Sequence, residues 1–133
     1  MIPPFNEQGY LPPGLHPASM DEIADRFGQS TEVRRVQLES LRWLVDTARV
    51  AGVLRLVVNG SFVTDEPEPN DVDCALLIGP GFPKDASAEQ EILTGLPFLH
   101  VELVEDAEFR SYVEVVFGTD RHLTRKGLIE VIS

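Results

Sequence analysis

Four short apolar segments constrain the fold more than any other feature, because each has the length of a strand and ends at residues that break strands. They cover residues 53–59, 71–78, 98–104 and 128–132. Other apolar residues recur at helical spacing over residues 20–27, 31–51, 86–94 and 106–118. Strands and helices that alternate in this way favour an α/β (α+β) fold, and we expect the last strand to lie at an edge of the sheet.

Two of the expected helices have well-marked ends. Ser19 and Glu22 have the spacing of a capping box, in which a serine and a glutamate three residues apart satisfy each other's backbone N–H groups. Gly28 is expected to close this first helix, and Gly52 to close the second, since glycine commonly ends helices.

Residues 1–18 form a proline-rich arm that contains five of the ten prolines in the chain. Proline lacks a backbone donor, so the arm is expected to be extended rather than helical or an inner strand. Apolar side chains are nevertheless spaced through it, at Ile2, Phe5, Tyr10, Leu11 and Leu15. We therefore expect the arm to lie across the domain formed by residues 19–133, or across a partner.

The chain has 133 residues and a formal net charge of −11, which repels phosphate backbones and anionic membrane surfaces. No apolar run approaches the roughly 20 residues of a membrane span, and the first residues lack the pattern of a signal peptide. A single cysteine, Cys74, excludes an internal disulfide framework and a cysteine-based zinc site. These features predict a cytoplasmic protein that does not bind membranes or coat nucleic acids.

Three features point to chemistry. Gly60 and Ser61 follow an apolar strand, where a glycine allows close backbone approach and a hydroxyl can bind phosphate oxygens. Asp71 and Asp73 are two residues apart on an expected strand, so their carboxylates would share one face and repel each other unless a cation lies between them. Mg²⁺ is the cation that prefers such ligands. Glu102 is an acidic residue in an otherwise apolar strand, where an unpaired charge is costly.

Each of these residues also has a structural reading. Asp71 could be a turn residue, Asp73 an exposed strand residue, and Glu102 an exposed residue of an edge strand. His100 shares a face with Glu102 by spacing, either beside the site or towards solvent. Positive groups that could offset a triphosphate are few in the sequence: Arg34, Arg35, Arg121, Arg125 and Lys126.

The order of the motifs resembles that of the DNA polymerase β-like nucleotidyltransferase superfamily: apolar strand, Gly60-Ser61, about ten residues, Asp71-Val72-Asp73, and a later strand with a third acid. The nearest resemblance is to minimal nucleotidyltransferases and their small bacterial relatives. Other segments that resemble those relatives are Ile2-Pro3-Pro4-Phe5, Leu11-Pro12-Pro13-Gly14, Pro69-Asn70 and Phe117-Gly118-Thr119-Asp120-Arg121. The resemblance implies a minimal nucleotidyltransferase fold with a mixed sheet of about four strands.

It also implies an activity. Such enzymes transfer a nucleoside monophosphate, here expected to be AMP, from an NTP to a hydroxyl. By position, Asp71, Asp73 and Glu102 would be the catalytic and Mg²⁺-binding residues, and Gly60 and Ser61 would bind the nucleotide phosphates. The third acid is more often aspartate in that superfamily, and the loop between the motifs carries Asp65, Glu66 and Glu68, which oppose an incoming triphosphate.

Two functions stay open besides a third, less favoured one, a sensor that binds an NTP without transferring any part of it. The first is a Mg²⁺-dependent transferase that modifies a protein or small molecule, as the antitoxin of a toxin–antitoxin pair does when it AMPylates its toxin; tRNA is a less favoured acceptor. The alternative is an inactive antitoxin or regulator of this fold that neutralises a basic protein by direct binding, and a homo-oligomer is compatible with both.

Overall fold

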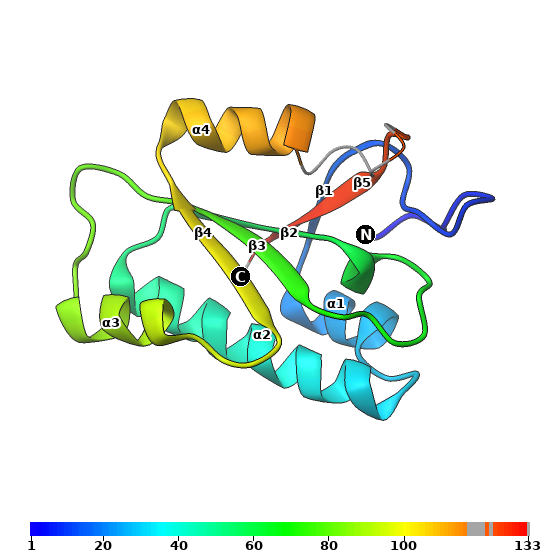
Figure 1. Cartoon of the computed structure of the whole chain (residues 1–133), viewed down its shortest axis with the longest axis horizontal. Helices are drawn as coiled ribbons and strands as arrows, with labels where there is room; N and C mark the ends of the chain where they lie inside the picture. Colours follow the sequence, from blue (N-terminus) through cyan, green and yellow to red (C-terminus); the bar gives the residue numbers. More distant parts are fainter. Residues whose placement is uncertain (117–121, 123, 133) are drawn as a thin grey trace.

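A five-stranded mixed sheet runs through the computed structural model, which describes residues 1–116, 122 and 124–132 (Figure 1). The strands are β1 (Gly14–Ala18), β2 (Arg55–Asn59), β3 (Val72–Leu77), β4 (Leu99–Val104) and β5 (Gly127–Val131), in the order β1-β5-β2-β3-β4. β2 pairs antiparallel with β3 and β5, whereas β3 with β4 and β1 with β5 are parallel pairs. β1 and β4 are therefore the two edges.

Helices cover both faces of the sheet. The long helix α2 (Glu32–Ala51) lies on one face together with α1 (Met20–Phe27) and α3 (Ala86–Thr94), and α4 (Asp106–Ser111) lies on the other (Figure 1). A short 3₁₀ turn, Ser61–Val63, follows β2, and a π-helical turn, Tyr112–Val116, continues α4. Among the described residues, none of the helices combines the length and the apolar character needed to cross a bilayer.

The alternation of side chains along β3 separates two cores. Val72, Cys74 and Leu76 pack into the core under α1, α2 and α3. Ala75 and Leu77 pack into the smaller core under α4. Because side chains alternate along a strand, Asp73 projects on the α4 face of the sheet, at the end of β3 that this smaller core leaves uncovered.

The ends of α1 and α2 lie where the sequence predicts them. The Ser19 side chain accepts a hydrogen bond from the Glu22 N–H, and the Glu22 carboxylate accepts one from the Ser19 N–H, which confirms the capping box. Gly52 ends α2 with a left-handed φ of 90°. The expected helix over 106–118 is α-helical only as far as Ser111, and its expected end at Gly118 lies outside the described residues.

Two expectations about the sheet are wrong. It has five strands rather than about four, because residues 14–18 of the arm form β1. The last strand, β5, lies inside the sheet and not at an edge, because β1 pairs with its outer side. An edge strand tolerates Pro17, since only one side of β1 has to supply backbone hydrogen bonds.

The arm lies across its own domain. Leu11 is fully buried, and Ile2 is buried in the same core. The Phe5 ring packs on Phe27, with ring centroids 6.0 Å apart, and the Arg26 guanidinium lies 4.4 Å from the centre of the Phe5 ring. The apolar residues of the arm therefore serve the core of this chain.

Candidate functional site at one edge of the sheet

The ends of three neighbouring strands bring the motifs together. Asn59, the last residue of β2, pairs with Asp73 near the start of the antiparallel strand β3. His100, near the start of the parallel strand β4, pairs with Asp73 on the other side. Gly60 follows directly after Asn59. The Gly-Ser turn and the Asp-x-Asp motif, 11 residues apart in the sequence, thus meet where β2 ends and β3 begins.

Gly60 packs directly against the Asp73 carboxylate. Its φ of 84° lies in the left-handed region that favours glycine. A Cβ atom at this position would overlap the Asp73 Oδ2 atom. The backbone therefore favours glycine here, and the missing Cβ leaves room for the Asp73 carboxylate in this orientation.

Asp71 and Asp73 differ in their surroundings. Asp71 is exposed and lies one residue before β3, whereas Asp73 is half-buried within it. Burial raises the pKa of the Asp73 carboxyl above its ordinary value, and the charge of Asp71 adds to this effect. The positive charges of His100 and Lys126 act in the opposite direction. Asp73 therefore lies within the electrostatic reach of one further acid and two basic groups.

Glu102 is not directly opposite Asp73 in the pairing of β3 with β4. Its partner in the ladder is Ala75, whereas Asp73 is opposite His100. The Nε2 atom of His100 and the Oε1 atom of Glu102 are 3.3 Å apart. Within the described part of the chain, no three His, Cys, Asp or Glu side chains are grouped closely enough to hold a metal ion. The three predicted acids thus share one face of the sheet, but Glu102 lies away from the strand end where Asp71 and Asp73 are found, and the three do not form a closed set of ligands.

Asn59 is a member of this cluster that the sequence patterns did not single out. Its side chain is buried, and its Oδ1 atom has no hydrogen-bond partner among the described residues. A buried polar atom without a partner is uncommon. Residues directly opposite in an antiparallel pair project to the same face, so Asn59 and Asp73 are neighbours. The signal in the sequence was a polar residue at the end of an apolar strand, immediately before Gly60.

These oxygen atoms suit a hard cation. Mg²⁺ is commonly bound by one or two carboxylates together with waters and substrate phosphates, and it does not need a cage made only of protein atoms. Asp71 and Asp73 supply two carboxylates, and Asn59, opposite Asp73 in the strand pair, supplies a buried amide oxygen that has no partner among the described residues. The donor set therefore fits Mg²⁺ without Glu102.

Arg34 is not part of this cluster. It is buried, and its guanidinium donates to the carbonyl oxygens of Phe62, Thr64 and Glu66 at 2.6–3.0 Å. It also donates to the carbonyl of Phe27 at 3.0 Å. Burial lowers the Arg34 pKa, although charged residues of the loop oppose this change. Arg34 holds the loop between the two motifs in place and is not available to a triphosphate.

Of the other basic candidates, Lys126 is the one that the described contacts connect to the cluster. It immediately precedes β5, and its charge acts on Asp73. Arg35 and Arg125 are exposed. Arg121 lies outside the described residues.

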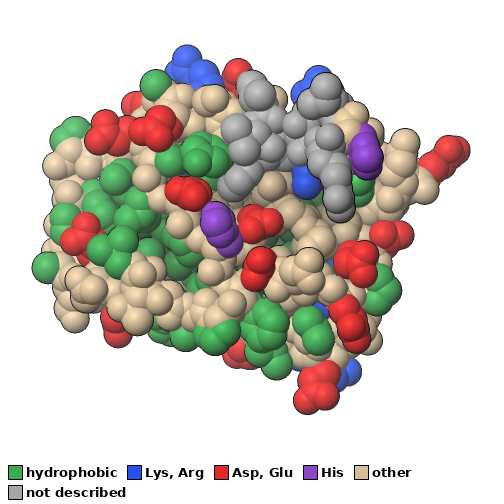
Figure 2. Space-filling model, in the orientation of Figure 1, with side chains coloured by type: hydrophobic (Ala, Val, Ile, Leu, Met, Phe, Trp, Pro, Cys, Tyr) green, Lys and Arg blue, Asp and Glu red, His purple; other side chains and the backbone are tan. Residues whose placement is uncertain are grey.

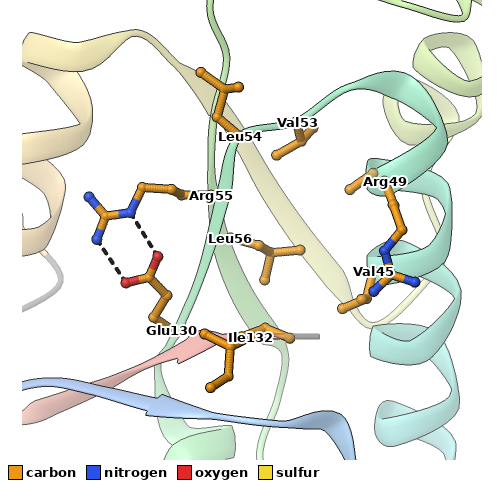
Figure 3. A pocket seen from close by; sticks show the side chains of 10 residues that line it. Val45, Arg49, Val53, Leu54, Arg55, Leu56, Glu130 and Ile132 are labelled. Atoms are coloured by element: carbon orange, nitrogen blue, oxygen red, sulfur yellow. Dashed lines mark hydrogen bonds and ion pairs between the residues drawn. The ribbon is translucent and has the colours of Figure 1, made fainter.

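The cluster lies open on the surface. Figure 2 shows acidic side chains gathered around a histidine near the middle of this face of the molecule. A hollow of about 330 Å³ lies at the opposite end of β2, where Arg55 donates to Glu130 at 2.7 and 2.8 Å (Figure 3). Val45, Arg49, Leu54 and Ile132 also line it. None of the motif residues lines this hollow, so its shape gives no support to the nucleotide site.

Comparisons with known proteins identify one family. A family model described as a family of unknown function (DUF6932) matches residues 3–132, which is nearly the whole chain. No curated protein and no solved structure shows significant similarity to the chain. The fold and the surface cluster are therefore the observations from which a function can be inferred.

Proposed function

Because this chain belongs to DUF6932, a family of unknown function, its activity has to be inferred from the site, and we propose that it is a Mg²⁺-dependent nucleotidyltransferase with a minimal nucleotidyltransferase fold. One observation carries the proposal: Gly60 lies against the carboxylate of Asp73. A glycine turn beside the acids allows the phosphates of an NTP to approach both the backbone and a cation held by the same acids.

Different residues of the cluster would bind the cation and the phosphates. Asp71, Asp73 and the Asn59 amide oxygen would hold Mg²⁺, which stabilises the charge on the attacking and leaving oxygens. Gly60 and the Ser61 hydroxyl would contact the phosphates. Lys126, whose charge already acts on Asp73, would offset the negative charge of the triphosphate. Such reactions depend on positioning and charge neutralisation more than on covalent help.

The reaction transfers a nucleoside monophosphate, which we expect to be AMP. The acceptor hydroxyl oxygen forms a bond to the α-phosphorus, the bond from that phosphorus to the bridging oxygen breaks, and pyrophosphate leaves. The Glu102 carboxylate takes up the proton of the hydroxyl. His100, 3.3 Å from Glu102 and opposite Asp73 in the ladder, would orient that carboxylate towards the reacting oxygen.

The charge of the chain favours a protein or small-molecule acceptor over tRNA. Asp65, Glu66 and Glu68 are exposed on the loop that joins the Gly-Ser turn to Asp71. Together with the net charge of −11 of the whole chain, these residues would repel a nucleic acid and attract a basic protein. A basic toxin modified by its antitoxin is the kind of acceptor that meets this requirement.

The test is transfer of label from α-³²P-labelled NTPs to a protein. The full chain is incubated with each NTP, Mg²⁺ and the product of the adjacent gene, and compared with the double variant Asp71→Asn, Asp73→Asn. Label from the α-phosphate should appear on the acceptor with the wild type, and should fall at least about 100-fold in the variant. Label from the γ-phosphate should not be transferred.

A matched control removes two negative charges elsewhere. Asp25 and Asp46 are exposed residues of α1 and α2, so the variant Asp25→Asn, Asp46→Asn should keep full transfer. Undiminished transfer by the Asp71→Asn, Asp73→Asn variant would exclude this cluster as the catalyst. Absence of Mg²⁺-dependent NTP binding by the wild type in calorimetry would exclude the activity.

The exposed acidic loop favours a second function, an inactive regulator that neutralises a basic protein by contact. In that case the Asp71→Asn, Asp73→Asn variant should bind the partner as tightly as the wild type. The variant Asp65→Asn, Glu66→Gln, Glu68→Gln should instead bind more weakly, because it loses the charges that attract the partner. Removal of residues 1–18 is not a suitable test, because it also removes β1 from the sheet.

A further inference from the structure

The two edges of the sheet differ in how they are protected. β1 contains Pro17, which cannot donate a hydrogen bond to another strand. β4 contains no proline, and none of the described strands pairs with its outer side. An exposed edge of this kind is able to pair with a strand of another chain.

The backbone of β4 determines which residues such a strand would meet. The carbonyls of Phe98 and Val104 accept hydrogen bonds from β3 and the residue after it. Hydrogen-bonding groups alternate along a strand, so the N–H and C=O groups of Leu99, Val101 and Leu103 face away from β3. The Leu99 N–H already donates to the Leu96 carbonyl at 3.1 Å, so the free edge offers the N–H groups of Val101 and Leu103 and the carbonyls of all three residues.

The side chains of β4 are complementary to a second copy of the same strand. In an antiparallel pair centred on Val101, Leu99 of each copy lies opposite Leu103 of the other, and Val101 of each copy exchanges both backbone hydrogen bonds with Val101 of the other. The same register places His100 of each copy opposite Glu102 of the other. A histidine opposite a glutamate stabilises an antiparallel pair by hydrogen bonding, and by opposite charge when the histidine is protonated, whereas two glutamates opposite each other destabilise it.

Apolar surface continues from β4 onto α3. A groove of about 260 Å³ is lined by Leu93, Leu96, Leu99, Val101 and Leu103 among other residues. Leu93 is 62% exposed although it is apolar. Figure 2 shows hydrophobic side chains gathered on the side of the molecule next to β4, above α3 as labelled in Figure 1. A second copy paired with β4 would cover part of this groove.

We propose that the chain forms a two-fold symmetric dimer in which β4 pairs antiparallel with β4 of a second copy, centred on Val101. The sheets of the two copies become continuous. Glu102 of each copy comes to lie beside His100 of the other, next to the Asp73 cluster. This proposal is independent of the proposed activity, because it depends only on the edge strand and its charges.

The experiment measures the mass of the full chain in solution by light scattering and sedimentation, in about 150 mM salt so that the repulsion between two chains of net charge −11 is screened. The wild type should have twice the 14.8 kDa mass of the chain. Val101→Pro removes an outward-facing N–H that β3 does not use, and should give a folded monomer. Val36→Lys, at an exposed position on α2, is the control and should remain a dimer.

A charge swap tests the register and does not depend on how well the proline variant folds. His100→Glu places like charges opposite each other and should give a monomer. Combining it with Glu102→His restores opposite pairs in this register and should restore the dimer. A monomeric wild type at all concentrations, a dimeric Val101→Pro or His100→Glu variant, or failure of the swap to restore the dimer would each overturn the proposal.

Discussion

Asp73 carries a charge in a half-buried position, and the surrounding groups only partly compensate for it. Burial and the neighbouring Asp71 raise its pKa, so the folded protein binds this proton more tightly than the unfolded chain. The sign of the pH dependence follows from this. Stability falls as the pH rises through the ordinary aspartate pKa of about 3.9 and on to the raised folded value, and the full penalty is present at neutral pH.

Asp73→Asn should therefore stabilise the protein at pH 7, by up to about 1 kcal/mol once solvent screening of a half-buried group is allowed for. The gain should shrink as the pH falls through the raised pKa of the Asp73 carboxyl, because the wild-type side chain then takes up its proton. Urea unfolding of both proteins across this pH range measures the difference. Asp46→Asn, on the exposed side of α2, is the control and should change stability by less than about 0.5 kcal/mol. A variant less stable than the wild type at pH 7 would contradict the interpretation.

At the scale of elements, α2 positions the loop that connects the two halves of the candidate site. Arg34 donates to several carbonyls of residues 61–66. Gln37, one turn further along, donates to the Pro69 carbonyl at 2.6 Å. Thr31, at the start of the helix, donates to the Pro67 carbonyl at 3.0 Å. Side chains on one face of the first turns of α2 thus hold the loop from Ser61 to Asp71 in place.

Arg34→Met should destabilise the protein by about 2–4 kcal/mol, because it keeps the bulk of the side chain but leaves buried carbonyls without donors. Arg35→Met, at the next and exposed position, should have an effect below about 0.5 kcal/mol. Denaturant unfolding gives the stabilities, and hydrogen exchange should show faster exchange in residues 61–69 of the Arg34 variant. Equal stability of the two variants would exclude the proposed role of Arg34.

At the scale of the whole molecule, the arm is a structural part of the domain. Leu11 is fully buried in the main core, and its carbonyl accepts a hydrogen bond from the N–H of Gly127 at the start of β5. His16 contacts the Pro12 carbonyl through Nε2 at 2.6 Å. The arm therefore packs against the start of β5, next to Lys126. This is the end of the central strands that also carries the Asp73 cluster.

Leu11→Ala should destabilise the protein by about 2–5 kcal/mol, since it leaves a cavity in the core. Leu54→Ala makes the same chemical change at a position that is 63% exposed, and it should cost much less. Thermal and denaturant unfolding of the two variants provide the comparison. If both variants lose the same small amount of stability, the arm does not contribute to the core as described.

Short sequence patterns correctly predicted the features that depend on contacts within a few residues. The capping box at Ser19 and the left-handed glycine at Gly52 depend on contacts within a few residues, and both have the expected geometry. The apolar segments over residues 53–59, 71–78 and 98–104 also contain the strands that were expected there, β2, β3 and β4. The i, i+2 spacing also predicted that His100 and Glu102 share a face, and they are 3.3 Å apart.

The sequence by itself thus determined the helices α1, α2 and α3, the strands β2 to β5 and most residues of the candidate site, but not β1 or the end of α4. Only the tertiary structure decided the position of β5 inside the sheet, the burial of Arg34 and the register that places His100, and not Glu102, beside Asp73. These outcomes depend on pairings between segments far apart in the chain. Which strand covers an edge, and by how many residues two strands are offset, is set by the packing of the whole core and leaves no signal in any single segment.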